Sequence, residues 1–261
     1  MYDFELVKPS SIADAAKAMA ADGAQALSGG QTLLPTMKQR LASPAVLVSL
    51  TGIAEMQGVC RGDGGLHVGG ATPHAVVARE AAAHYPALSV LAGGIGDPAV
   101  RNRGTIGGSI ANNDPAACYP AAVLGSGATV VTNRRQIAAD DYFQGMFTTA
   151  LDEGEFVIEV RFPIPQKAAY VKFNQPASRF ALTAVFVAKF ADGVRVAVTG
   201  ASNDGVFRWT EAEKALSADF SAGAIAGLAV DASDMISDLH GTPAYRANLV
   251  KVLTGRAVTA A

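Results

Sequence analysis

The sequence predicts an α+β fold, in which strands and helices follow one another along a chain of 261 residues. Two observations support this prediction. Short apolar runs rich in β-branched residues alternate with stretches of helical spacing. Adjacent glycines mark two loops, and Pro163-Ile164-Pro165 then breaks the chain. Because this length suits one large domain or two smaller ones, we place a domain boundary there, giving residues 1–165 and 166–261.

The first 52 residues predict a βαβ-like unit, which we treat as a subdomain. Alternation predicts a first strand, and Pro9-Ser10-Ser11 introduces a helix that has Ile12, Ala15 and Met19 on one face. The expected strands are Met1–Lys8, Ala24–Ser28 and Ala45–Leu50, and the second helix is Thr32–Arg40.

Residues 53–165 predict a second subdomain of helices and strands. Thr72 followed by Pro73 is typical of an N-cap and a first helical position, so a helix is expected from there to about His84. The other expected elements are a helix from Pro86 that ends at Gly93-Gly94, and strands at Ala128–Thr132 and Phe156–Phe162.

Residues 166–261 predict a small antiparallel sheet followed by helices. The expected strands are Ala169–Asn174, Phe180–Lys189 and Val194–Val198, and the expected helices are Trp209–Leu216, Ala222–Leu228 and Pro243–Leu253.

Composition excludes several classes of function. The formal charge of −2 and the absence of a long basic run argue against nucleic-acid binding as the main task. The longest apolar run, Phe180–Ala188, is too short for a transmembrane segment. The N-terminus lacks the pattern of a secretory signal, and Cys60 and Cys118 have no metal-binding spacing, so we expect a reducing cytoplasm, no disulfide and no metal site.

The two glycine loops predict a phosphate-binding site. Gly29 and Gly30 have no Cβ to hinder a left-handed backbone or a close approach, so successive N–H groups can face a phosphate at the start of a helix. Residues 105–109 (TIGGS) offer the same donors, with the hydroxyls of Thr105 and Ser109 as further ligands. Together the loops suit a pyrophosphate, although each one alone is equally compatible with a simple turn.

Neither loop fits a standard nucleotide-binding motif. No Gly-Lys-Ser/Thr follows, Lys38 lies too far along its helix to act as a P-loop lysine, and the G-x-G-x-x-G spacing is absent. The four histidines, His67, His74, His84 and His240, show no ligand pattern and are expected at the surface or in caps. We therefore predict no catalytic acid or base.

Three segments together resemble the FAD-binding medium subunit of molybdenum hydroxylases, the carbon monoxide dehydrogenase and xanthine dehydrogenase family. These segments are SGGQTLLP (28–35), ATPHAVVA (71–78) and IGDPAVRNRGTIGGSIANNDPAACYP (95–120). The resemblance covers essentially the whole chain. It implies a vanillyl-alcohol-oxidase-like (PCMH-type) FAD-binding domain in two subdomains, a smaller C-terminal α/β sandwich-like domain, and a flavin between them.

The resemblance also implies which residues bind FAD. Residues of the two loops would hold the pyrophosphate and ribityl region. Ile95 would pack near the isoalloxazine, Val157 would line its polar edge, and Lys172 would lie near the ring, while core packing or an exposed strand lysine are the alternatives. The full set is Leu27, Ser28, Gly29, Gly30, Gln31, Thr32, Leu33, Ile95, Thr105, Gly107, Gly108, Ser109, Asp114, Val157 and Lys172.

The chain departs from the family pattern around Cys118. Related chains commonly have an acidic residue there, so a carboxylate contact to the cofactor is absent, and Asp114 is expected either to cap its turn or to face the ribose. Asn112-Asn113 replaces a frequent histidine or alanine. Cys118 is expected to be a small buried residue rather than a redox centre.

The resemblance implies partner subunits. Two isolated cysteines cannot ligate iron–sulfur clusters, so a small subunit with two [2Fe-2S] clusters and a large molybdopterin subunit are expected, usually as a dimer of heterotrimers. Electrons would pass from molybdenum through the clusters to FAD and on to an external acceptor. Quinone is preferred, with NAD and dioxygen open, and the complex is expected in the cytoplasm or at the inner face of the membrane.

Two other functions stay open at this stage. One is a free-standing FAD-dependent oxidoreductase, although the sequence shows no convergent set of titratable residues for a substrate pocket. The other is a scaffold subunit that has lost FAD. It is suggested by Cys118 and Asn113, which depart from the family pattern.

Overall fold

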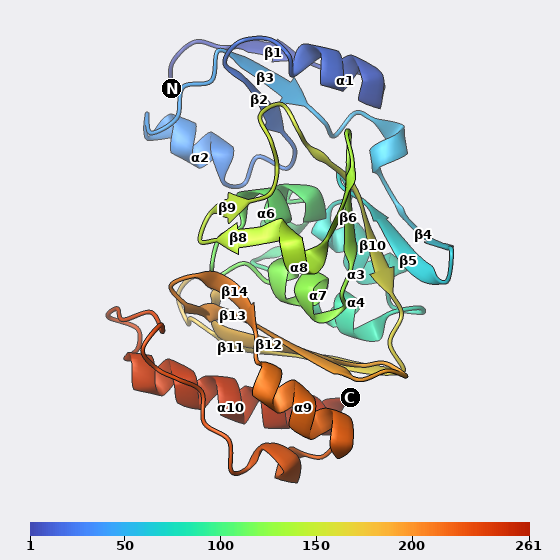
Figure 1. Cartoon of the computed structure of the whole chain (residues 1–261). Helices are drawn as coiled ribbons and strands as arrows, with labels where there is room; N and C mark the ends of the chain where they lie inside the picture. Colours follow the sequence, from blue (N-terminus) through green and yellow to red (C-terminus); the bar gives the residue numbers. More distant parts are fainter.

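The computed structural model describes residues 1–261 as three main sheets with helices packed against them (Figure 1). The N-terminal unit, drawn in blue, contains a parallel sheet of order β1-β3-β2. A helix lies in each connection between its strands, which is how parallel neighbours are joined. Its elements match those predicted: β1 (Glu5–Val7), α1 (Ile12–Ala18), β2 (Ala24–Leu27), α2 (Leu33–Lys38) and β3 (Val46–Ser49).

The second sheet is antiparallel, with the order β4-β5-β10-β6-β7. Helices α3, α4, α6 and α7 lie between this sheet and the third one (Figure 1). The strands are β4 (Val59–Gly62), β5 (Gly65–Gly69), β6 (Thr129–Thr132), β7 (Gln136–Ala138) and β10 (Val157–Pro163). The helices are α3 (His74–Glu80), α4 (Pro86–Gly93), α5 (Pro98–Arg101), α6 (Ile106–Asn112) and α7 (Tyr119–Gly125).

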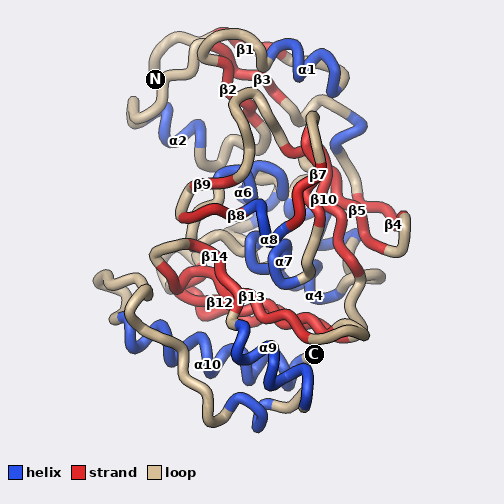
Figure 2. The backbone as a smooth tube through the Cα atoms, viewed as in Figure 1, coloured by secondary structure: helices blue, strands red, loops and turns tan.

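The third sheet is antiparallel and is covered on both faces. Its strands are β11 (Lys167–Asn174), β12 (Ala181–Lys189), β13 (Val194–Ser202) and β14 (Gly205–Arg208). Helices α4 and α7 contact one face, and α9 (Thr210–Ala218) and α10 (Pro243–Ala260) cover the other (Figure 2).

Burial on both faces explains the apolar run in β12. Side chains alternate between faces along a strand, so Phe186 and Ala188 enter the core shared with the second sheet. Val185 and Val187 enter the core under the C-terminal helices. The first of these cores therefore continues across the boundary predicted at Pro165, which lies in the turn between β10 and β11.

The structure corrects three of the predicted elements. Thr72 is not an N-cap, because α3 begins at His74 and the Thr72 hydroxyl instead donates to Gly58 O and accepts from Gly58 N. The helix predicted at 222–228 is only a 3₁₀ turn, η2 (Ala222–Ile225), whereas α10 continues seven residues beyond the predicted Leu253.

Several short elements were not predicted from the sequence. Besides β4, β5, β7, β14 and α5 to α7, they are η1 (Ala54–Met56), α8 (Ala139–Tyr142), β8 (Phe143–Gly145) and β9 (Thr148–Thr149). None of the helices combines the length and apolar character needed to cross a bilayer.

Candidate functional site

The two glycine loops meet in the structure and form one site. The first loop follows β2 and crosses the segment that leads into α6. A hydrogen bond of 2.7 Å joins Ser28 Oγ to Thr105 Oγ1, although the two residues are 77 positions apart. Gly29 is buried here, and a Cβ on it would overlap Arg103 O and lie 2.6 Å from the Gly104 Cα. Glycine is therefore required for the two loops to approach this closely.

The first loop presents a row of free backbone donors. The N–H groups of residues 28–32 donate to no acceptor within the protein. Gly30 has a φ of 69°, in the left-handed region. The side-chain amide of Gln31, through Nε2, donates to Gly29 O at 3.2 Å. Such successive unpaired N–H groups at a loop bind anionic oxygens. The predicted residues from Ser28 to Thr32 thus fit a phosphate group.

The second loop contributes fewer free backbone donors than predicted. Gly107 N donates to Gly70 O at 2.9 Å, and Gly108 N donates to Thr105 Oγ1, the N-cap of α6, at 3.2 Å. These two N–H groups are therefore engaged within the protein, and the expectation of a second row of free donors is not met. The Thr105 hydroxyl is itself bonded to Ser28 Oγ and to Gly108 N, so what remains at this loop is the Ser109 hydroxyl and the bare Cα of Gly108.

The two adjacent glycines of this loop face different surroundings. A Cβ on Gly107 would lie 2.6 Å from Gly70 O, in the packed contact between α6 and the end of β5. A Cβ on Gly108 would point at the junction of the loops, 3.1 Å from Thr105 Oγ1 and 3.6 Å from Ser28 Cβ. Gly107 serves the packing of the fold, whereas Gly108 faces the site.

Lys172 is bonded to the backbone of the residue that precedes Ile95. Its ammonium donates to Gly94 O at 2.6 Å and to Arg179 O at 3.1 Å. It also lies 3.7 Å from Cys118 Sγ. The structure therefore brings together the two residues expected near the flavin ring and the cysteine that departs from the family pattern.

The remaining predicted residues lie around these two groups. Val157 is buried in β10 next to Gly70, the residue that binds Gly107. Asp114 caps its turn, because its Oδ1 accepts from Ala116 N at 2.8 Å. Leu27 ends β2 and Leu33 begins α2, so they flank the first loop.

Buried polar residues near α6 and α7 were missed by the sequence analysis. His74 was expected at the surface or in a cap, but it is only 5% exposed, and its ring centroid lies 5.3 Å from that of Tyr119. Burial, with the nearby Arg101 guanidinium, lowers the pKa of His74 to about 4. His74 Nδ1, Tyr119 OH and Asn113 Oδ1 have no hydrogen-bond partner in the protein. No spacing signal in the sequence pointed to them.

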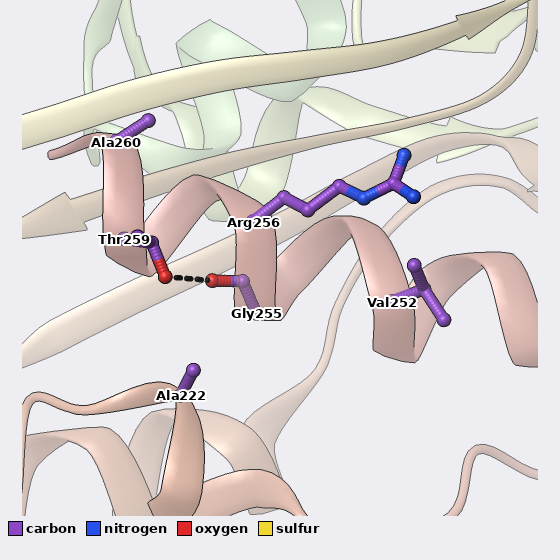
Figure 3. A pocket seen from close by; sticks show the side chains of 6 residues that line it. All are labelled: Ala222, Val252, Gly255, Arg256, Thr259 and Ala260. Carbon is purple, nitrogen blue, oxygen red and sulfur yellow. Dashed lines mark hydrogen bonds between the residues drawn. The ribbon is translucent and has the colours of Figure 1, made fainter.

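Two hollows lie elsewhere on the molecule. One, of about 420 Å³, lies between α10 and η2 and is lined mostly by small side chains and Arg256 (Figure 3). The other, of about 780 Å³, is more polar, but its charged side chains are already paired. Arg195 and Arg208 both donate to Asp140, Arg208 also donates to Glu213, and Arg195 also donates to Leu124 O. Neither contains a residue of the predicted site.

Comparison with known proteins gives the family. Residues 2–165 match the family described as the FAD binding domain in molybdopterin dehydrogenase. The chain is 34% identical to the carbon monoxide dehydrogenase medium chain of Afipia carboxidovorans over 276 residues, covering 98% of this chain and 95% of that one. It is 31% identical to the glyceraldehyde dehydrogenase medium chain of Sulfolobus acidocaldarius, with 98% and 97% covered.

Solved structures agree with this similarity. A chain of quinoline 2-oxidoreductase from Pseudomonas putida 86 matches with a TM-score of 0.88 and 27% identity, covering 100% of this chain and 97% of that one. A chain of carbon monoxide dehydrogenase from Hydrogenophaga pseudoflava matches with a TM-score of 0.87 and 31% identity, with the same coverage. These findings confirm the resemblance drawn from the glycine loops. This chain therefore belongs to the family of FAD-binding domains of molybdopterin dehydrogenases and is an oxidoreductase subunit of that family.

Proposed function

We propose that this chain carries FAD in a molybdenum hydroxylase complex and passes electrons from the [2Fe-2S] clusters of a partner subunit to an external acceptor. The observation that carries the proposal is the junction of the two glycine loops at Ser28 and Thr105, with the row of free N–H groups beside it. A pyrophosphate needs such donors. A Cβ on Gly29 would overlap the backbone of the second loop and keep the two loops apart. The residues present therefore fit FAD.

The site residues have distinct tasks in this proposal. Residues 28–32, between Leu27 and Leu33, bind the pyrophosphate through their N–H groups. The Ser109 hydroxyl binds a phosphate or ribityl oxygen beside Gly107 and Gly108, and Thr105 contributes by holding Ser28 at the junction. Ile95 packs against the isoalloxazine, with Lys172 next to it, and Val157 lines its polar edge. Asp114 supports the turn that leads from α6 to α7, through its bond to Ala116 N.

The bound FAD supplies the redox chemistry, and the protein supplies the position and the electrostatic surroundings. The fold assigned to this task is the two-subdomain, vanillyl-alcohol-oxidase-like arrangement, with subdomains of about 1–52 and 53–165 and a C-terminal domain of 166–261. The contacts between residues 28–29 and 103–105 support it, because they hold the N-terminal unit against the second one.

The proposed partners are a small iron–sulfur subunit and a large molybdopterin subunit, as a dimer of heterotrimers in the cytoplasm or at the inner face of the membrane. Similarity to a carbon monoxide dehydrogenase medium chain over nearly the whole chain supports this assembly. Quinone is the acceptor we assign.

The test is the visible spectrum, the identity of the released cofactor and the subunit masses of the protein purified from its native host. We expect flavin bands, released FAD, and copurification with an iron–sulfur and a molybdenum subunit. A yellow chain purified alone that turns over a small donor would instead indicate a free-standing flavoenzyme. A colourless chain that cannot be reconstituted with FAD would indicate a scaffold.

A further inference from the structure

Three successive backbone carbonyls beside the proposed flavin site are bound by two cations. Lys172 Nζ donates to Gly94 O at 2.6 Å. Arg101 Nη1 donates to Ile95 O and to Gly96 O, both at 3.0 Å. Lys172 belongs to β11 of the third sheet and Arg101 to α5, so the loop that carries Ile95 is held from two parts of the fold. We name these two residues and their three carbonyls the cationic clasp.

No carboxylate compensates the charges of the clasp. Neither Lys172 nor Arg101 has a carboxylate oxygen within 4.0 Å of its nitrogens. The third contact of Lys172 is the sulfur of Cys118 at 3.7 Å. The two aspartates nearest in sequence face backbone instead, since Asp97 accepts from Val100 N and Asp114 from Ala116 N.

Three buried titratable side chains near the clasp, His74, Tyr119 and Tyr170, are held in their neutral forms. The pKa of His74 lies at about 4 because of burial and the Arg101 charge. Burial raises the pKa values of Tyr119 and Tyr170 well above the ordinary tyrosine value. The clasp is therefore a pair of positive charges with no directly paired carboxylate, in a partly buried place where charges act over a longer range than in water.

We propose that the cationic clasp raises the reduction potential of the bound flavin, and that Cys118 allows this because it leaves Lys172 without a carboxylate partner. The inference rests on the proposed function, which places the flavin ring beside Ile95 and Lys172. Two electrons and one proton, delivered from the partner subunit's clusters and from solvent, leave the ring with one negative charge. Two uncompensated cations beside the ring stabilise that reduced form more than the neutral oxidised form.

The experiment compares Cys118→Asp with Cys118→Ser in the full chain reconstituted with FAD. The reduction potential is measured by equilibration with a redox dye, and FAD affinity is measured separately. The aspartate adds a carboxylate next to Lys172, whereas serine is of similar size to cysteine and adds no carboxylate. We expect Cys118→Asp to weaken binding of reduced relative to oxidised FAD by about tenfold, which is a fall of about 30 mV for a two-electron couple. Cys118→Ser should leave the potential unchanged.

A second pair of variants keeps the inference falsifiable if Cys118→Asp does not fold. Lys172→Met removes a charge of the clasp and should lower the potential in the same direction. Lys167→Met is the control, because it removes the same charge from the same strand without touching the cationic clasp. The Lys167 ammonium instead lies over the Phe220 ring, 5.8 Å from its centre. An unchanged potential in Lys172→Met would overturn the inference. Failure of the unmodified chain to bind FAD would instead overturn the proposed function.

Discussion

Gly107 and Gly108 are adjacent residues with different physical roles. The Gly107 Cα packs against the backbone of Gly70, and its N–H is bound there. The Gly108 Cα instead faces Ser28 and Thr105 at the loop junction. Gly107 is required by the packing of the fold, and we propose that Gly108 serves the ligand, so substitutions at the two positions should differ in what they change.

Gly107→Ala should lower the free energy of unfolding of the FAD-free chain by about 1–3 kcal/mol, because its Cβ overpacks a rigid backbone contact. Gly108→Val should abolish FAD retention without a comparable loss of stability, because its side chain enters the phosphate site. Urea unfolding and FAD content are the measurements. Gly255→Val is the control, since a Cβ on Gly255 of α10 has no neighbour nearer than 3.8 Å. Unchanged flavin content in Gly108→Val would refute the cradle at this loop.

His74 makes stability depend on pH. Its folded pKa of about 4 lies below the ordinary value of 6.5, so the unfolded chain binds more protons between these values. This contribution to stability is fully present above pH 6.5, falls as the pH falls from 6.5 to 4, and amounts to about 3 kcal/mol. Urea unfolding of the FAD-free chain at several pH values measures it. In His74→Gln, the fall in the free energy of unfolding between pH 6.5 and 4 that comes from His74 should disappear. The same pH dependence in both proteins would show that His74 is not its source.

At the scale of elements, α10 is attached to the third sheet through a buried arginine. Arg246 is 3% exposed and donates to Leu182 O at 2.5 Å and to Gly200 O at 2.7 Å. It also binds both carboxylate oxygens of Asp238, in the loop before the helix. The arginine therefore fixes both the helix and the loop that leads into it.

Arg246→Met should lower the free energy of unfolding by about 2–4 kcal/mol, because two buried carbonyls and one carboxylate lose their donor. Arg256→Met is the matched control on the same helix. Arg256 is exposed and makes no hydrogen bond or ion pair through its side chain, so its effect should stay within about 0.5 kcal/mol. Chemical denaturation of both variants gives the comparison. Equal effects at the two positions would show that the buried contacts contribute nothing.

At the scale of the whole molecule, one hydrophobic core joins the second and third sheets. Phe186 of β12 packs edge-on against Tyr85, with ring centroids 6.1 Å apart. Tyr170 and Ala197 enter the same core from β11 and β13. The helices between the two sheets are therefore buried only when both sheets are present.

A fragment of residues 1–165 should consequently fail to fold cooperatively. Without the third sheet, the apolar faces of α4 and α7 become exposed to water, and exposed apolar patches of this kind favour aggregation. The full chain should give a sharp urea transition, whereas the fragment should give a broad one or precipitate. A fragment that unfolds as sharply as the full chain would show that the shared core is dispensable.

Local patterns along the chain predicted most of the main elements. The βαβ-like unit, β6, β10, strands β11 to β13, α9 and the start of α10 depend on hydrophobic periodicity and on Pro and Gly breaks. Helices α6 and α7 were not predicted, because α6 contains Gly107-Gly108 and α7 has an apolar residue at nearly every position. Both are stabilised mainly by burial in the shared core, which leaves no amphipathic pattern.

The sequence by itself determined the family, through two glycine loops and the segment between Ile95 and Pro120, because backbone approach to a phosphate requires glycine wherever it occurs. Only the tertiary structure decided which glycine packs inside the fold and which faces the loop junction, that Ser28 meets Thr105, and that Lys172 faces Cys118 rather than a carboxylate. These contacts join residues more than 50 positions apart. They depend on how the three sheets pack together, and no local pattern in the chain contains that information.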